Sequence, residues 1–187
     1  SAPKDDPALT DRLERLRRVV SELNGKAARL LGENSALTTQ PGRAVSVSLG
    51  ALVREASAEA QVAFATTALR LQIVEQGDSP AVTCDRKSLR LVVLAVLQNA
   101  LEACSARGQG AISIIVRRRE RNAEVEIVDD GGGVSEETVS LFEPFFAARA
   151  GSSGLGLGLP MARRMMERRG GAIRIKSQGG APAVLIE

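Results

Sequence analysis

Glycine and leucine alternate from Gly154 to Leu159, directly before a segment with helical periodicity that begins with Pro160. Glycines in this place leave backbone amides uncovered at the positive end of a helix, and proline is tolerated in the first helical turn. Such a junction suits the binding of phosphate groups. No lysine follows the glycines as in a P-loop, and G-x-G-x-G differs from the dinucleotide fingerprint G-x-G-x-x-G. The pattern therefore predicts an anion site on another kind of fold.

Two further elements carry polar groups in apolar surroundings. Asp129 ends a predicted strand and is followed by Asp130 and the glycines 131–133, which puts a carboxylate at the mouth of a turn. Asn99 lies within an apolar helix expected over residues 85–105. A plain tight turn and a surface asparagine would look the same when each is taken alone, so the order of the three elements matters more than any one of them.

Helical and strand-like patterns follow one another along the chain. Helices are expected over residues 49–64, 85–105, 136–141 and 160–169, with Ser48 as the N-cap of the first. Strands are expected over residues 68–74, 111–116, 123–128, 172–177 and 183–186. The charged run 117–122 is interpreted as the solvated end of a hairpin. This order predicts an α+β fold, in which a mixed sheet is covered on one face by helices.

The N-terminal forty residues have a pattern of their own. From Leu9 to Leu31 apolar residues recur at alternating spacings of four and three, and Gly32 ends the segment. This pattern is typical of a coiled-coil or helix-bundle seam and favours association between chains. A helix packed on its own domain is the alternative, although it would usually show a wider apolar stripe. Residues 33–43 resemble a linker.

Composition excludes several functions. The chain has no histidine, so imidazole zinc ligands and histidine-based catalysis within the chain are excluded. A net charge of +3 and four phenylalanines without Trp or Tyr give no footprint for nucleic acid. Two isolated cysteines suit a reducing, cytoplasmic compartment. The longest apolar run, 91–97, is too short to span a bilayer, and we expect neither a membrane span nor a signal peptide.

The motifs in their order resemble the catalytic ATP-binding domain of bacterial sensor histidine kinases, in the GHKL ATPase superfamily. The likeness extends from about residue 45 to residue 187, and Leu-Phe-Glu-Pro-Phe-Phe at 141–146 resembles the F box of the nitrogen-regulator type. It implies a two-layer sandwich of the Bergerat type over 45–187. Residues 1–40 would then be an N-terminal helix, similar to the second helix of the dimerisation domain, together with a linker.

The resemblance implies a role for each matching residue. Asn99 would ligate the Mg²⁺ that bridges the ATP phosphates, and Asp129 would accept a hydrogen bond from the adenine amine. Gly131 and Gly133 would let the base approach the backbone. The phosphate end of the site would be formed by Gly154, Gly156, Gly158 and Leu159. A cation near the γ-phosphate would be Arg149, and the F box that anchors the lid hinge would be Phe142, Phe145 and Phe146.

The resemblance also implies the reaction and its partners. The γ-phosphoryl group of ATP would move to a histidine on another segment or chain, in a homodimer that serves a downstream response regulator. At Ala95, one turn before Asn99, the family usually has Asn or another polar residue that helps to hold Mg²⁺. A nucleotide-binding pseudokinase that acts as a dimeric interaction module is therefore the alternative. An ATP-hydrolysing switch is disfavoured, because that branch typically has Glu at this position.

Overall fold

A computed structural model gives the structure of the chain and describes residues 42–63, 68–132, 141–143, 156–178 and 181–186. The chain divides into two compact units, Ser1–Pro41 and Gly42–Glu187. The helix expected over 9–31 and most of the expected helix 136–141 lie outside the described residues. The second unit contains the sheet and helices described below.

The sheet has five strands in the order β2-β4-β5-β7-β6. Their bounds are β2 Ala68–Gln76, β4 Gln109–Arg119, β5 Asn122–Asp129, β6 Ile173–Gln178 and β7 Ala181–Ile186. β2 is parallel to β4, whereas the other neighbours are antiparallel. β4 and β5 form the predicted hairpin, and Glu120 takes the left-handed conformation in its turn, with φ 54°. The sheet is thus mixed, as predicted.

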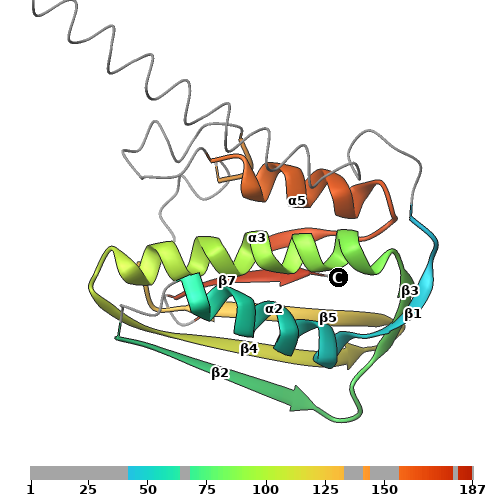
Figure 1. Cartoon of the computed structure of the whole chain (residues 1–187), viewed down its shortest axis with the longest axis horizontal. Helices are drawn as coiled ribbons and strands as arrows, with labels where there is room; N and C mark the ends of the chain where they lie inside the picture. The colour runs from blue at the N-terminus through green and yellow to red at the C-terminus, as the bar shows by residue number, and fades with distance from the viewer. Residues whose placement is uncertain (1–41, 64–67, 133–140, 144–155, 179–180, 187) are drawn as a thin grey trace, which may run out of the picture. The chain divides into compact units, whose positions relative to one another are not determined.

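Three helices lie on one face of this sheet, α2 Leu49–Ala63, α3 Arg86–Ser105 and α5 Gly158–Glu167 (Figure 1). α3 is the central helix, because it packs on β4 and β5 and also contacts both α2 and α5. The other face of the sheet carries no helix among the described residues. The predicted α+β fold of two layers is confirmed.

The core lies between α3 and the sheet. Alternate residues of β4 and β5 point toward the helices, and the largest of them, Ile112, Ile114 and Ile127, are fully buried. Leu97 and Leu101 of α3 are buried against them. Truncating any of these side chains to alanine would cost about 2–5 kcal/mol of folding free energy. By length and composition α3 could cross a membrane, but half of it is buried inside the domain, which is typical of a core helix.

A small second sheet was not predicted. Strands β1 Val45–Ser48 and β3 Ala81–Cys84 pair antiparallel with each other alone. The loop between β2 and β3 also caps α2, since the Leu49 amide donates to the Pro80 carbonyl oxygen and the Gly50 amide to the Ser79 hydroxyl, both at 3.0 Å. Ser48 stands directly before the first residue of α2, where we predicted the N-cap, but the hydroxyl that binds the Gly50 amide is that of Ser79, 29 residues further along the chain.

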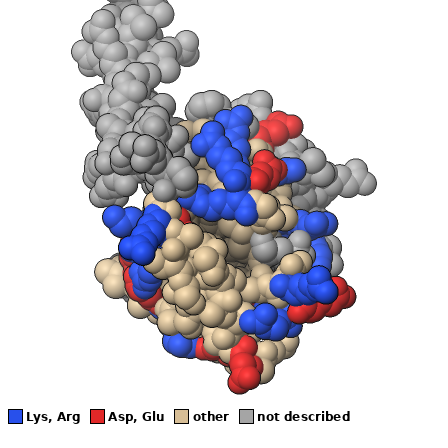
Figure 2. Space-filling view, turned by 90° about the vertical axis from the view of Figure 1, so that its right-hand side faces the viewer, with Lys and Arg blue, Asp and Glu red and all other residues tan. Residues whose placement is uncertain are grey.

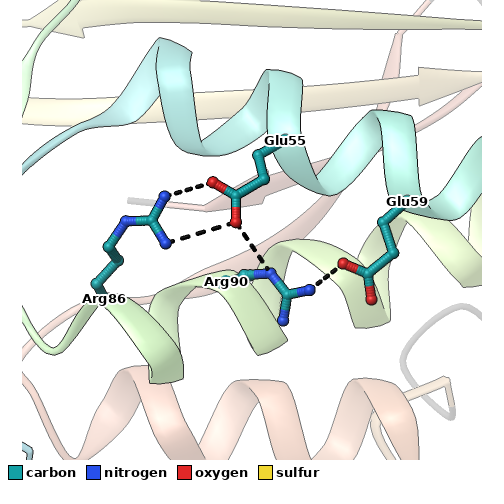
Figure 3. A network of polar contacts seen from close by, with 4 residues as sticks. All are labelled: Glu55, Glu59, Arg86 and Arg90. Atoms are coloured by element: carbon teal, nitrogen blue, oxygen red, sulfur yellow. Dashed lines mark hydrogen bonds and ion pairs between the residues drawn. The ribbon is translucent and has the colours of Figure 1, made fainter.

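On the face seen in Figure 2, basic and acidic side chains both lie around the edge, and the middle is largely uncharged. Between α2 and α3, Arg86 and Arg90 form ion pairs with Glu55 and Glu59 (Figure 3). These side chains are 30–50% exposed. Exposed pairs of this kind each contribute about 0–1 kcal/mol, so the network stabilises the helix pair only modestly.

The hairpin differs from expectation in one respect. Arg117 does not project into solvent, but pairs with Glu124 and Glu126, whose side chains are 1% and 5% exposed. All three residues lie on the face of the sheet opposite the helices. Arg118 and Arg119 are exposed, so only this part of the arginine triplet is solvated as predicted.

Candidate nucleotide site

Asn99 and Ala95 lie one turn apart on α3, and both are half-buried. Ten residues of α3 are buried in the core, whereas these two lie at its edge. A Cβ atom built on Gly158 would lie 3.7 Å from the Ala95 Cβ, so this edge of α3 borders the first residue of α5. The structure thus brings the predicted asparagine helix next to the predicted glycine-led helix.

Asp129 ends β5 and is only 4% exposed. One of its carboxylate oxygens, Oδ1, accepts a hydrogen bond from the Gly131 amide at 3.1 Å. No described residue forms an ion pair with it. Burial raises the pKa of Asp129 to about 6, the Gly131 amide opposes this shift, and the charge of Asp130 adds to it. A buried acceptor that lacks a cation suits a neutral donor such as an amine of a ligand.

The neighbouring Asp130 is bonded within the domain itself. Its Oδ1 accepts a hydrogen bond from the Ala111 amide at 2.7 Å, and its own amide donates to the Ala111 carbonyl oxygen at 3.2 Å. Arg107 donates to its carbonyl oxygen at 3.1 Å. These bonds tie the end of β5 to the start of β4. Asp130 therefore holds the strand end in place, while Asp129 stays available.

Gly131 is required by packing against α3. A Cβ atom there would lie 2.4 Å from the Ala103 carbonyl carbon and the Cys104 nitrogen, which are backbone atoms that cannot move aside. We predicted this glycine as a point where a base approaches the backbone, but the described contact is with α3. Burial raises the pKa of Cys104 to about 11, with the charges of Asp129 and Asp130 adding to the effect, so this thiol stays protonated.

The first amides of α5 receive no side-chain cap from the residue that precedes the helix. Leu157 is the N-cap residue and forms no side-chain cap bond. Gly156 has φ 64°, a left-handed conformation that favours glycine. Leu159 is 5% exposed, so its side chain belongs to the core and only its backbone could face a ligand. Uncapped amides at a helix start attract anions, as the sequence predicted for this junction.

Phe142 of the F box contacts α5. The guanidinium carbon of Arg163 lies 4.9 Å from the centre of the Phe142 ring, and Arg163 Nε lies 2.9 Å from a Glu167 carboxylate oxygen. A cation over an aromatic face is attracted by about 0.5–1 kcal/mol at a partly exposed place. The remaining predicted site residues lie outside the described residues, namely Gly133, Phe145, Phe146, Arg149 and Gly154.

Sequence reasoning missed Asp130, Arg107 and Arg163, which position the elements of the site. A signal was present only for Asp130, whose place in Asp-Asp-Gly-Gly-Gly suggested a turn. The roles of the two arginines depend on partners 21 and 23 residues away and cannot be read from local pattern.

The arrangement defines a nucleotide-binding domain: a two-layer sandwich with a carboxamide at the edge of its central helix, a buried carboxylate at a strand end and an uncapped, glycine-led helix. Residues 84–185 match the model of the histidine kinase-, DNA gyrase B- and HSP90-like ATPases. The chain belongs to this family, whose domain binds ATP.

Relatives and solved structures agree with this assignment. The chain is 34% identical over 137 residues to the signal transduction histidine-protein kinase AtoS of Escherichia coli, which is 72% of this chain and 22% of AtoS. It is 30% identical over 161 residues to the nitrogen regulation protein NtrY of Azorhizobium caulinodans, covering 81% of this chain and 20% of NtrY. The chain thus spans about a fifth of the length of these relatives.

Among solved structures, the fold is similar to the catalytic domain of histidine kinase ThkA in a nucleotide-free form. The TM-score is 0.67 at 23% identity, over 77% of this chain and 95% of that one. The mycobacterial sensor histidine kinase MprB gives a TM-score of 0.62 at 24% identity, over 76% of this chain and 95% of that one. These likenesses establish the fold of the sandwich.

Proposed function

We propose that the chain is the ATP-binding catalytic domain of a two-component sensor histidine kinase, which transfers the γ-phosphoryl group of ATP to a histidine on another segment or chain. The observation that carries this proposal is the buried Asp129 carboxylate, held at a strand end beside the helix that bears Asn99. The names of the relatives support the kinase assignment and give no support to the pseudokinase alternative. Because the chain contains no histidine, the acceptor comes from elsewhere.

The proposed site has an adenine end and a phosphate end, and different residues would bind the ligand at each. Asp129 would accept a hydrogen bond from the adenine amine, and the amides at the start of α5, from Gly156 to Gly158, would bind phosphate oxygens. Arg149 would supply a cation near the γ-phosphate. Phosphoryl transfer needs little covalent work from the protein, so positioning and charge neutralisation are its main contribution.

Asn99 would hold Mg²⁺ through its carboxamide oxygen. The described residues contain no cluster of three or more His, Cys, Asp or Glu that could hold a metal ion. This fits Mg²⁺, which is commonly bound by one or two protein ligands together with phosphates and waters. When bound, Mg²⁺ would neutralise charge on the phosphates, while Asn99 orients it from α3.

The test is a calorimetric titration with ATP, followed by transfer of labelled phosphate from ATP to a supplied dimerisation domain that bears the acceptor histidine. We expect micromolar or weaker binding and labelling that depends on Asn99. Binding without any labelling of several such acceptor domains would favour the pseudokinase. Absence of binding would contradict the proposal as a whole.

The affinity for ATP is expected to depend on pH, because the pKa of Asp129 lies at about 6 in the free domain. The ionised carboxylate is the better acceptor for the adenine amine, so binding should lower this pKa and should weaken as pH falls below about 6. Titrations from pH 5 to pH 8 measure this. The same titrations with Asp129→Asn should lose the pH step, and a step that survives the substitution would assign it to another group.

We further propose that the protein acts in the cytoplasm as a homodimer through the seam 9–31, with a response regulator as the downstream partner. A lone helix of this length is marginal in water, and its apolar edge needs a partner. Replacing Leu16 and Leu23 by Lys should give monomers that bind ATP with unchanged affinity. Sedimentation measures this, and a wild type that is monomeric at high concentration would show that the seam packs elsewhere.

A further inference from the structure

An ion pair joins the start of α3 to the turn that follows α5. Arg169 Nη2 lies 3.2 Å from Asp85 Oδ2, and the two residues are 84 positions apart. Asp85 is also the N-cap of α3, since its Oδ1 accepts from the Lys87 amide at 3.1 Å and its Oδ2 from the Ser88 hydroxyl at 2.6 Å. One carboxylate thus caps the central helix and binds a cation from the turn after α5.

The environment of this ion pair differs from that of the exposed pairs between α2 and α3. Asp85 is 9% exposed and Ser88 is 1% exposed. Burial raises the pKa of Asp85, but the hydrogen bonds from Ser88 and the Lys87 amide and the charge of Arg169 outweigh it, so the net shift is downward. The carboxylate is therefore ionised at neutral pH. Only the carboxylate is buried, since the Arg169 side chain is 28% exposed. Loss of Arg169 would leave this buried charge without its cation, which is costly.

The two helices touch at both ends of α5. At its first residue, Gly158 approaches Ala95 of α3, and just beyond its last turn Arg169 binds Asp85. α5 therefore runs antiparallel to α3. The two contacts are ten residues apart on α3 and eleven on α5, and ten residues of helix span about 15 Å.

Between these contacts, α5 packs on the domain through buried apolar residues, Leu159, Ala162 and Met165. Apolar packing is not directional and by itself permits small sliding of one helix along another. The Asp85–Arg169 ion pair requires two particular atoms to meet at a set distance and angle. It therefore fixes how far α5 extends along α3. The position of the uncapped amides of α5 relative to Asn99 depends on how far α5 extends along α3.

The chain enters this unit directly over the ion pair. A Cβ atom on Gly42 would lie 2.8 Å from the Asp85 Cγ, and the Asp85 side chain cannot move away without losing its three hydrogen-bond donors. Gly42→Ala is therefore a second way to disturb the ion pair without removing either charge.

We propose that Arg169 is a positioning residue for the phosphate groups of the nucleotide, and that it acts through Asp85 by holding α5 lengthwise on α3. This rests on the function proposed above. Within the described part of the chain, Arg169 forms no hydrogen bond or ion pair with a predicted site residue, so its effect should be confined to the ligand groups that α5 binds. The adenine end, formed by Asp129 on β5, should be independent of it.

The test compares ATP with AMP as ligands of the full chain. Arg169→Gln should weaken ATP binding by about tenfold, since misplacement of binding groups by about 1 Å is costly. AMP binding should change less than twofold, because AMP lacks the β- and γ-phosphates that the α5 amides would bind. The matched control is Arg168→Gln, which removes an exposed arginine next in the chain and should change neither affinity. Gly42→Ala should shift ATP binding in the same direction as Arg169→Gln.

A purely structural role would weaken both ligands together, as partial unfolding does, and that result would overturn the proposal, as would unchanged ATP binding in Arg169→Gln. A wild type that binds neither ligand would instead overturn the proposed function. The two failures are therefore distinguishable.

A second variant adds a readout that general destabilisation cannot reproduce. Arg169→His introduces the only imidazole in the chain, so its titration can be followed directly by NMR. The quantity to follow is the ATP affinity of Arg169→His divided by that of wild type. This ratio should be close to one at pH values below the pKa of the imidazole. At higher pH it should fall to the ratio found for Arg169→Gln. Taking the ratio cancels the titration of Asp129. The nearby Cys84 stays neutral, since burial and then Asp85 raise the pKa of its thiol. A ratio independent of pH would contradict the proposal.

Discussion

Replacing Asp129 by asparagine is expected to weaken ATP binding and, at the same time, to stabilise the folded domain. For binding, the amide can present a donor to the adenine amine in place of an acceptor. The expected loss is about 1–3 kcal/mol, roughly a 5- to 150-fold increase in Kd. Calorimetric titration of wild type and variant with ATP measures it, and equal affinities would remove Asp129 from the site.

The gain in stability follows from the raised pKa of Asp129, about 6 against an ordinary value of 3.8. An acid whose pKa is raised on folding disfavours the folded state increasingly as pH rises from the unfolded to the folded pKa. Two pH units correspond to about 3 kcal/mol at neutral pH. Asparagine carries no charge and avoids this cost, so Asp129→Asn should raise the free energy of unfolding by up to about 3 kcal/mol at pH 7.5.

Denaturant unfolding at two pH values tests this explanation. The excess free energy of unfolding of Asp129→Asn over wild type should be about 1.4 kcal/mol smaller at pH 5 than at pH 7.5. At pH 5 the folded wild type is mostly protonated at Asp129. The matched control is Asp78→Asn, which changes an exposed aspartate between β2 and β3, away from the site. That variant should not gain stability and should retain ATP binding. A stability gain that is equal at both pH values would contradict the assignment to Asp129.

The elements predicted from sequence are those whose signals are local. The hairpin β4–β5 was predicted because alternating apolar residues flank a charged turn, and α3 because Asp85 caps a long apolar run. β1 and β3 were missed because each has four residues and pairs only with the other, whose residues lie from 33 (Ser48 to Ala81) to 39 (Val45 to Cys84) positions away. Nothing in either segment alone distinguishes a strand from a loop.

The site residues also differ in whether their signals are local or depend on distant partners. Asn99 and Asp129 stand in motifs whose order is visible in the sequence, and the structure brings their elements together around α3. The Asp85–Arg169 ion pair and the contact of Arg163 with Phe142 arise only once α5 is packed. Arginine is common on helix surfaces, so its spacing carries no information about which carboxylate or ring it will meet. Positioning residues are therefore harder to predict than the groups they position.

Ala95 is the position where the sequence departs, in a chemically testable way, from the motif that it resembles. Residues 95 and 99 emerge on the same face of α3, and residue 95 faces the start of α5, with the Ala95 Cβ 3.7 Å from a Cβ built on Gly158. A longer side chain at 95 would therefore extend between Asn99 and the uncapped amides of α5. The methyl group of alanine offers no ligand there, so a water would have to take that place on Mg²⁺.

We accordingly expect the wild type to bind ATP with weak dependence on Mg²⁺ and to transfer the phosphoryl group slowly. Ala95→Asn should strengthen the Mg²⁺ dependence of ATP binding and raise the rate of acceptor labelling on the order of tenfold, an effect of the size seen when groups that tune a metal site are changed. The measurement is labelled-phosphate incorporation into a supplied histidine-bearing domain at several Mg²⁺ concentrations. Binding of AMP, which depends on Asp129, should not change.

The control for this substitution is Ala51→Asn, which adds the same side chain at an exposed position of α2 and carries the same cost in helix propensity. It should leave the rate and the Mg²⁺ dependence at wild-type values, so any gain in Ala95→Asn belongs to the position and not to the residue type. A wild type that is already fast and strongly dependent on Mg²⁺ would show that Asn99 and water suffice. In that case alanine at 95 does not limit the rate of phosphoryl transfer. Its small side chain then serves only to let α5 approach α3 closely at Gly158.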